Sequence, residues 1–286
     1  MPEGPEIRRA ADQVAAAIVG RRAIRVWFGL PAIKRHGKAL SGQRVIRVEP
    51  RGKALLTHFE GGRTLYTHNQ LYGRWQVVKP SKLPRTSRSL RVAIENEHRW
   101  ALLYSASDIE VLPTDQVNAH PYIARLGVEL LDETIRLADV QRQVDDSRFA
   151  RKSLAALLLD QGFLAGIGNY LRSEILYVAR LRSEWKLGDL DEAGRARLAA
   201  AALDLTRQSY RTRGITNDLE RAASLKAGGM SYGRYRHHVF DREGEPCWEC
   251  GTRVIRRNLG GRAVFECGAC QGEHHVGKHT KPARKK

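Results

Sequence analysis

The four cysteines of the chain lie in two Cys-x2-Cys pairs, and this spacing constrains the local fold more than any other feature of the sequence. The pairs are Cys247/Cys250 and Cys267/Cys270, and sixteen residues separate them. Each pair can form a tight turn that directs two thiolates to one point, as in four-cysteine zinc sites. Two disulfides or a redox-active dithiol are the alternatives, but a reducing compartment favours a metal. We predict one structural Zn²⁺, since four protein ligands leave no open position.

The residues between the two cysteine pairs alternate as the strands of a β-hairpin do, over 253–257 and 262–266. The hairpin carries four arginines: Arg253, Arg256, Arg257 and Arg262. A rigid basic hairpin is suited to a row of phosphates or a DNA groove.

The charge balance predicts a polyanionic partner. Lys and Arg total 49 against 31 Asp and Glu, a formal net charge of +18. Nucleic acid is the leading candidate. An anionic membrane would call for an amphipathic basic helix or a lipidation signal, and the sequence has neither. A solvated basic face without a partner is the remaining alternative.

The N-terminus places acidic residues where a secretory signal would have an apolar core. No apolar run approaches the ~20 residues that span a bilayer. We therefore expect a cytoplasmic protein without a membrane partner. We also expect it to be a monomer.

The periodicity of apolar residues changes after about residue 112. A helix over 7–18 is followed by short alternating segments, which predict strands at 23–28, 44–49, 54–59, 64–68, 74–78, 90–95 and 100–104. Strands at this density indicate a β-sandwich. Later segments have helical spacing, at 114–120, 135–144, 154–159, 170–179 and 192–209. The predicted fold class is α+β and multidomain, with an N-terminal β-sandwich flanked by helices and a helical C-terminal domain that carries the zinc finger.

These changes predict the domain boundaries. The N-terminal β-sandwich domain covers 2–112, a linker 113–133, the helical domain 134–236, the zinc finger 237–271 and a basic disordered tail 272–286. Residues 211–236 are rich in Arg and Gly, which is typical of a mobile loop.

Pro2 follows the initiator Met1, whose removal would leave a secondary amine at the chain terminus. An α-amino group has a pKa of roughly 7.7–8.0, so a useful fraction is neutral and nucleophilic near pH 7. Amines attack carbonyl-like carbon to form Schiff bases, and Glu3 lies beside this amine as a candidate general acid. Many proteins begin with Met-Pro, so the pair alone is weak support for catalysis.

Four motifs in order resemble the formamidopyrimidine-DNA glycosylase and endonuclease VIII family. They are the N-terminal MPEGPEI, Arg51-Gly52-Lys53, the stretch 160–176 that resembles the family's helix–two-turn–helix, and the zinc finger with Arg262 ahead of Cys267. The resemblance covers about residues 2–271. Gly4 and the stretch 66–73, YTHNQLYG, place the chain nearest the bacterial endonuclease VIII branch.

The resemblance implies the catalytic roles. Pro2 is the expected nucleophile on C1′ of the damaged nucleotide, and Glu3 the acid that assists base departure. Lys53 is implied as a proton donor that contacts phosphate. Arg262 is implied as a phosphate ligand that supports elimination, with simple solvent exposure as the alternative.

The resemblance also implies the DNA contacts. Gln70, Leu71 and Tyr72 would fill the gap left by the extruded nucleotide, although a Leu and a Tyr can equally be core residues of a strand. Asn169 follows two glycines at a predicted helix start, which suits either an anion site or a helix cap. Arg125 is a further contact by family position.

Glu6 and Glu174 are expected to be supporting acids near the active site, and Glu174 could instead pair with an Arg on a helix surface. Family members flip the damaged nucleotide from duplex DNA into a cleft.

The expected function is that of a bifunctional DNA glycosylase/AP lyase of base-excision repair in the bacterial cytosol and nucleoid. It would remove oxidised bases, pyrimidines favoured, through a Schiff base on Pro2 and nick the strand by β,δ-elimination. Beyond Zn²⁺ no cofactor is expected. A non-catalytic zinc-finger DNA-binding protein and an RNA-associated zinc-ribbon protein are the alternatives. The Arg/Gly-rich stretch 211–236 is a candidate for base recognition.

Overall fold

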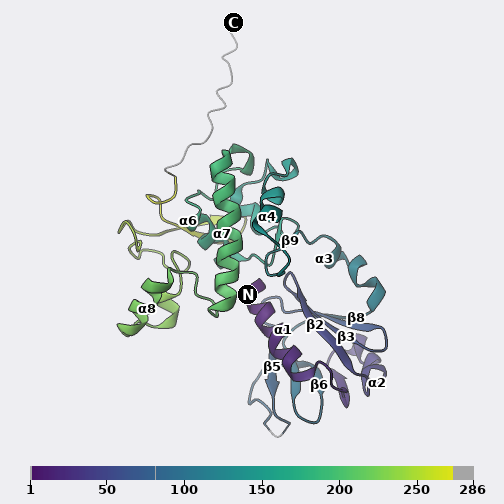
Figure 1. The fold of residues 1–286 in the computed structure, drawn as a ribbon. Helices are drawn as coiled ribbons and strands as arrows, with labels where there is room; N and C mark the ends of the chain where they lie inside the picture. Colours follow the sequence, from purple (N-terminus) through teal and green to yellow (C-terminus); the bar gives the residue numbers. More distant parts are fainter. Residues whose placement is uncertain (1, 81, 273–286) are drawn as a thin grey trace. The chain divides into compact units, whose positions relative to one another are not determined.

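A computed structural model describes residues 2–80 and 82–272 of the chain (Figure 1). The chain divides into two compact units, Met1–Leu131 and Asp132–Lys286. The segment predicted as a linker, 113–133, contains the 3₁₀ helix η2 (Thr114–Ala119) and α3 (Pro121–Ala124), which belong to the first unit. Apart from Gly272, the predicted tail 272–286 lies outside the described residues.

The N-terminal unit is the predicted β-sandwich. One antiparallel sheet has the strand order β2-β3-β4-β8 and the other β1-β6-β7-β5. The strands are β1 (Arg25–Phe28), β2 (Val45–Arg51), β3 (Ala54–Phe59), β4 (Arg63–His68), β5 (Arg74–Val78), β6 (Leu90–Glu95), β7 (Trp100–Tyr104) and β8 (Asp108–Pro113). β8, an edge strand that ends in Pro113, was not predicted from the sequence. Proline is tolerated at such an edge because no strand beyond it needs the missing N–H.

Alternation along the strands gives each sheet two buried faces. In β3, Leu55 and Phe59 join the core between the sheets, together with Val92 of β6. Ala54 and Leu56, which flank Leu55, face the other side, where they pack with Val117 of η2 and Ile123 of α3. The helix α1 (Gly4–Ile18) packs on β2 and β5 with its apolar stripe, so its first turn is fixed relative to the strand ends (Figure 1). The remaining elements of this unit are η1 (Pro31–Ile33), α2 (His36–Leu40) and β9 (Val128–Glu129).

The C-terminal unit is helical, as predicted. Its long helix α7 (Glu192–Arg211) packs against α4 (Leu137–Val144) and α6 (Asn169–Val178). Shorter elements are η3 (Ser147–Phe149), α5 (Leu154–Leu157), β10 (Leu164–Ala165) and η4 (Leu187–Asp189). Two helices, α8 (Leu219–Ala227) and α9 (Tyr232–Tyr235), occupy part of the stretch predicted as a mobile loop. Asp218 caps α8 by accepting a hydrogen bond from the N–H of Arg221, a local signal for a helix start.

The cysteine module has the predicted hairpin, formed by β11 (Ile255–Leu259) and β12 (Arg262–Glu266). Gly260 and Gly261 form its two-residue turn, with φ of 61° and 74°. Both angles lie in the left-handed region, which glycine adopts without strain. The turn places Arg262 at the tip of the hairpin. The predicted α+β fold class is confirmed.

Candidate active site and nucleic-acid interface

The first turn of α1 positions the predicted nucleophile. Glu3 is the residue that precedes the helix, and its side chain is buried. Its backbone N–H donates to Glu6 Oε2 at 3.0 Å, and Glu6 Oε1 accepts from Arg9 Nη2 at 2.7 Å. Glu6 therefore fixes the helix start beside Pro2. Pro2 is half-buried, and Pro2 and Glu6 line one cavity of about 280 Å³.

Gly52 and Lys53 form the two-residue turn between β2 and β3. The paired residues Arg51 and Ala54 flank this turn. Gly52 has a φ of 56°, and a Cβ there would meet the Tyr122 hydroxyl at 2.8 Å, so only glycine fits. The N–H of Gly52 donates to Glu129 Oε2 at 2.8 Å, and the N–H of Lys53 donates to the Tyr122 hydroxyl at 2.8 Å. The turn is thus rigid, and Lys53 is buried within it.

The residues predicted to fill the gap in DNA are exposed in a loop between β4 and β5. Leu71 is 59% and Tyr72 69% exposed, so the core-residue alternative is wrong. The loop is braced at both ends. Ser107 Oγ donates to Gln70 Oε1 at 2.9 Å, and Arg88 Nη1 donates to the Tyr72 carbonyl at 2.7 Å. We refer to residues 69–73 as the wedge loop.

Gln70 and Arg125, both predicted DNA contacts, line a second cavity of about 540 Å³ in the N-terminal unit. The guanidinium of Arg125 lies 5.5 Å from the centre of the Tyr122 ring. Burial lowers the pKa of His68 in this cavity, the charges of Lys53 and Arg125 add to the effect, and Asp108 opposes it. Burial raises the pKa of Tyr122 to about 12, so its hydroxyl keeps its proton at neutral pH. Asp108 and Glu110 also line the cavity, so its charged groups are of both signs, and Arg125 is the cation among its lining residues.

In the C-terminal unit the buried Arg172 connects Asn169 to the β11–β12 hairpin. Its Nη2 donates to Asn169 Oδ1 at 2.7 Å and to the Ala263 carbonyl at 2.8 Å. Ala263 is the neighbour of Arg262, so one guanidinium sets the start of α6 and the hairpin tip relative to each other. Gly168 precedes the helix as its cap residue, and Asn169 is the first helical residue, so the cap alternative for Asn169 is wrong.

The arginines of the hairpin fall into two groups. Arg253 donates to the Gly244 carbonyl at 2.7 Å, and Arg257 pairs with Glu266 at 3.2 Å. Arg256 and Arg262 are exposed, and their side chains form no hydrogen bond or ion pair with any residue that the structure describes. These two are available to phosphates.

Glu174 is fully buried in α6 and pairs with no Arg among the residues that the structure describes. Its carboxylate accepts hydrogen bonds from the N–H groups of His238, Val239 and Phe240 at 2.8, 2.8 and 2.9 Å, and from Thr216 Oγ1 at 2.6 Å. Burial alone would raise the pKa of Glu174, but the His237 and His238 charges and these hydrogen bonds hold it below its usual range. Glu174 therefore anchors the segment that leads into the cysteine module.

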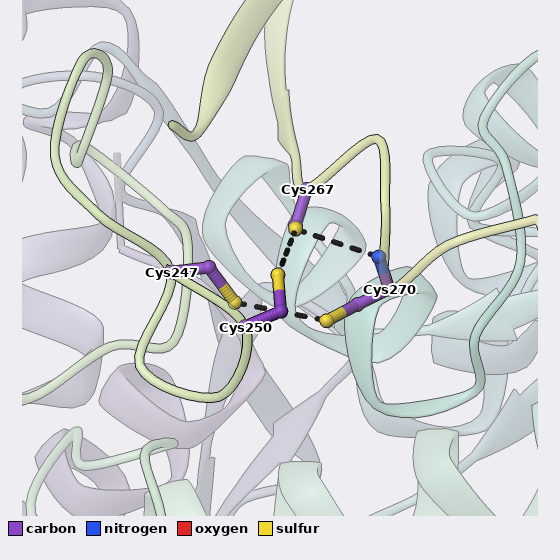
Figure 2. A group of neighbouring side chains, drawn as sticks. All are labelled: Cys247, Cys250, Cys267 and Cys270. Atoms are coloured by element: carbon purple, nitrogen blue, oxygen red, sulfur yellow. Dashed lines mark hydrogen bonds between the residues drawn. The ribbon is translucent and has the colours of Figure 1, made fainter. Parts of the chain in front are cut away.

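The four cysteine sulfurs converge between the turn before β11 and the turn after β12 (Figure 2). All four Sγ atoms lie within 4.8 Å of one another, with 3.8 Å between Cys247 and Cys270 and 3.4 Å between Cys250 and Cys267. None is in a disulfide. A tetrahedral site with Zn–S bonds of about 2.3 Å requires sulfurs about 3.8 Å apart, so the geometry fits a metal ion with four thiolate ligands. The hydroxyl of Tyr177 lies 3.2 Å from Cys247 Sγ and can donate to its thiolate.

Three residues of the site were not predicted from the sequence. Tyr122 comes close to Gly52 only in the folded protein, because it lies 69 positions after Lys53, its hydrogen-bond partner. Arg172 had an available signal, since a position three residues after Asn169 lies on the same helix face. Asn69 and its neighbour Gln70 look alike in sequence, but Asn69 is buried.

Comparison with known proteins defines the class of this fold and site. Residues 1–105 match the family described as the formamidopyrimidine-DNA glycosylase N-terminal domain. The chain is 46% identical to Endonuclease 8 of Escherichia coli over 271 residues, which cover 95% of this chain and 100% of that protein. Endonuclease 8 of Klebsiella pneumoniae is 45% identical over the same shares of both chains.

The fold of this chain is also similar to that of solved protein structures. Lactococcus lactis Fpg (MutM), in a complex with DNA that contains an oxidised pyrimidine, superposes with a TM-score of 0.78 at 21% identity. The match covers 94% of this chain and 99% of that chain. Another complex, of the LlFpg protein with a THF-DNA and an inhibitor, gives a TM-score of 0.79 at 21% identity, with 95% and 100% of the two chains covered.

These similarities and the site define a base-excision-repair enzyme, a DNA glycosylase with AP lyase activity. The chain belongs to the formamidopyrimidine-DNA glycosylase and endonuclease VIII family, on the side of the endonuclease 8 proteins. The non-catalytic zinc-finger alternative is not favoured.

Proposed function

We propose that this chain removes oxidised pyrimidines from duplex DNA with the amine of Pro2 as nucleophile. The main support is that Pro2 shares a cavity with both ends of the wedge loop, Asn69 and Gly73. A nucleophile beside side chains that replace an extruded nucleotide has the arrangement that base excision requires.

In the proposed reaction the Pro2 nitrogen bonds to C1′, and the C1′–N bond to the damaged base breaks. Glu3 supplies a proton as the base leaves. The Pro2 nitrogen then loses its proton, the C1′–O4′ bond breaks with protonation of O4′, and an iminium forms at C1′. This iminium withdraws electrons, so the C2′ proton is lost and the bond from C3′ to its phosphate oxygen breaks. A second elimination breaks the C5′–O bond, which leaves a one-nucleotide gap flanked by phosphates. Hydrolysis of the Pro2–sugar adduct restores the amine.

We assign the remaining roles from position and charge. Lys53 donates a proton from the rigid turn and contacts phosphate. Gln70 and Arg125 hold the DNA from the N-terminal unit, and Asn169 and Arg262 hold it from the C-terminal unit. A net charge of +18 favours such phosphate contacts throughout. The four cysteines would hold one Zn²⁺, which stabilises the hairpin.

The partner in this proposal is damaged duplex DNA, and the protein acts as a monomer in the cytosol. Among the described residues, no helix has both the length and the apolar character that crossing a membrane requires.

The first prediction tests the nucleophile. Protein that begins at Pro2 should form a covalent adduct with a duplex that contains an abasic site when sodium borohydride is present, because borohydride reduces the iminium to a stable amine. Protein with one extra residue before Pro2 has no secondary amine at its terminus and should form none. Denaturing gels measure the adduct. The proposal fails if the Pro2-terminated protein gives no adduct, or if the extended protein gives as much.

A further inference from the structure

The N-terminal unit has a surface at the far end of α1 that the proposed chemistry does not use. α1 has 15 residues, so at about 1.5 Å per residue its two ends lie about 22 Å apart. Pro2 precedes one end, and after the other end residues 19–23 run beside residues 42–45. A ligand on this surface therefore does not compete for space with a nucleotide at Pro2.

Two arginines lie directly opposite each other between these segments. Arg22 and Arg44 form an isolated antiparallel bridge. Nη1 of Arg22 donates to the Gly42 carbonyl at 2.9 Å, and Nη1 of Arg44 donates to the Gly20 carbonyl at 3.0 Å. These bonds orient both guanidinium groups, although like charges directly opposite each other are unfavourable. An anion that accepts from the remaining N–H groups of both arginines would relieve the repulsion.

Carboxylates of the chain neutralise this pair only in part. Glu60 Oε2 lies 4.0 Å from Arg44 Nε, and Arg22 has no ion pair with any residue that the structure describes. The surrounding sequence adds to the positive charge, because residues 13–48 contain eight Lys and Arg and no Asp or Glu. The surface therefore favours an anionic partner.

Apolar side chains flank the two arginines. Ile24 is 58% and Ile46 53% exposed, while Ala23 and Val45, which separate them from the arginines, are buried. This alternation puts each isoleucine on the same side of the chain as its neighbouring arginine. Outside the wedge loop, Leu83 is the only other large apolar residue of the described chain that is more than half exposed. Apolar groups of a partner would remove both isoleucines from water.

A hollow of about 270 Å³ adjoins Arg22 and Ile24. Its other lining residues are Arg21, Asn96, Glu97 and His98. Two guanidinium groups against one carboxylate leave a positive balance. The hollow is smaller than the roughly 300–1,000 Å³ of sites for drug-sized ligands, so it suits a single side chain of a peptide better than a free metabolite.

We propose that this surface docks an acidic segment of a partner protein in which carboxylates alternate with apolar side chains. We call it the arginine-pair surface and define it as Arg21, Arg22, Ile24, Arg44 and Ile46. Carboxylates of the segment bond to the two opposed guanidinium groups, and its apolar side chains cover the two isoleucines. DNA phosphates would supply the anions but would leave the isoleucines in water, so the observations favour a peptide over DNA. The inference does not depend on the proposed chemistry at Pro2.

The second prediction tests the surface with three labelled peptides of equal length, built from the repeats Asp-Asp-Leu, Asn-Asn-Leu and Asp-Asp-Ser. The Asp-Asp-Leu peptide should bind the complete protein with a Kd of about 100 μM or tighter in about 0.1 M salt. The other two should bind at least ten-fold more weakly, because one lacks the charges and the other lacks the apolar groups. Fluorescence anisotropy measures the binding.

Two double variants locate the binding site. Arg22→Gln with Arg44→Gln, and Ile24→Ser with Ile46→Ser, should each weaken binding of the Asp-Asp-Leu peptide at least ten-fold. The matched control is Lys82→Gln with Leu83→Ser, which changes an exposed cation and an exposed apolar residue of the same unit outside the surface. It should bind the peptide as the wild type does. If the arginine variant does not fold, the isoleucine variant decides alone.

Three outcomes would overturn the inference. The first is no binding of the Asp-Asp-Leu peptide up to about 1 mM, or equal binding of all three peptides. The second is that the control variant loses as much affinity for the peptide as the two surface variants do. The third is that undamaged duplex DNA displaces the peptide and both surface variants lose the same factor in affinity for that DNA, because the surface would then be a DNA contact.

Discussion

At the scale of single residues, the site depends on glycines, which allow two segments to approach closely, and on buried polar groups, which connect them. Gly52 lets the Lys53 turn lie against Tyr122, with a φ of 56° that other residues adopt only with strain. The sequence motif Arg51-Gly52-Lys53 indicated a special turn. It did not indicate Tyr122, because a hydrogen bond to a distant hydroxyl leaves no local pattern.

The third prediction concerns Gly73 in the wedge loop. Gly73→Ala would place a Cβ 2.5 Å from the Asn69 carbonyl oxygen, so the loop backbone must move. We expect base excision to fall at least ten-fold and stability by about 1–3 kcal/mol, as for other strained or overpacked sites. Single-turnover excision from a dihydrouracil duplex and urea unfolding measure the two effects. Gly233→Ala, where a Cβ meets nothing within 4 Å, is the control. A wild-type rate for Gly73→Ala would contradict the role of the loop.

At the scale of elements, a few buried polar groups connect segments that are far apart in sequence. Arg172 joins the start of α6 to β12, and Glu174 joins α6 to residues 238–240. Strand positions were predictable because alternation is a local property, and β3, β5, β6 and β7 have the predicted bounds. The partners of Glu174 were not predictable, since backbone N–H groups carry no sequence signature.

The fourth prediction is a pH dependence of stability that arises at this junction. Burial lowers the pKa of His237 to about 4 from 6.5, the charges of Arg236 and His238 add to the effect, and Glu174 opposes it. The folded state stays neutral where the unfolded chain binds a proton. Stability is therefore complete above pH 6.5 and decreases as the pH falls toward 4, by about 3 kcal/mol for this group.

His237→Phe should flatten this part of the profile and lower stability at pH 7, because the hydrogen bond with Thr216 is lost. Unfolding free energies from urea titrations between pH 4 and 7 measure the effect. Replacement of the exposed His98 by Phe serves as the comparison. Parallel profiles for the wild type and His237→Phe would show that His237 does not set the dependence.

At the scale of the whole molecule, each unit contributes a different kind of group to the proposed function. In the proposed reaction the N-terminal unit supplies the nucleophile and the wedge loop. The proposed phosphate ligands of the C-terminal unit depend for their placement on the cysteine module, because Cys247 and Cys267 belong to the small core under the hairpin.

The fifth prediction follows from that dependence. Removal of metal from the complete protein by a chelator should weaken binding to duplex DNA at least ten-fold and lower the melting temperature, because Arg256 and Arg262 lose their rigid support. Added Zn²⁺ should restore both. Cys250→Ser, in the absence of chelator, should resemble the stripped protein. Unchanged binding after verified metal removal would contradict the structural role of the site.

The sequence by itself determined the features that depend on neighbouring residues. The cysteine spacing determined the four-cysteine cluster, alternation determined most strands, and the ordered motifs indicated the family. Tertiary structure alone decided that Arg172 connects Asn169 with the hairpin and that Glu174 binds backbone N–H groups of residues 238–240. The physical reason is that burial and hydrogen-bond supply at a residue are set by segments far away along the chain, which no local pattern records.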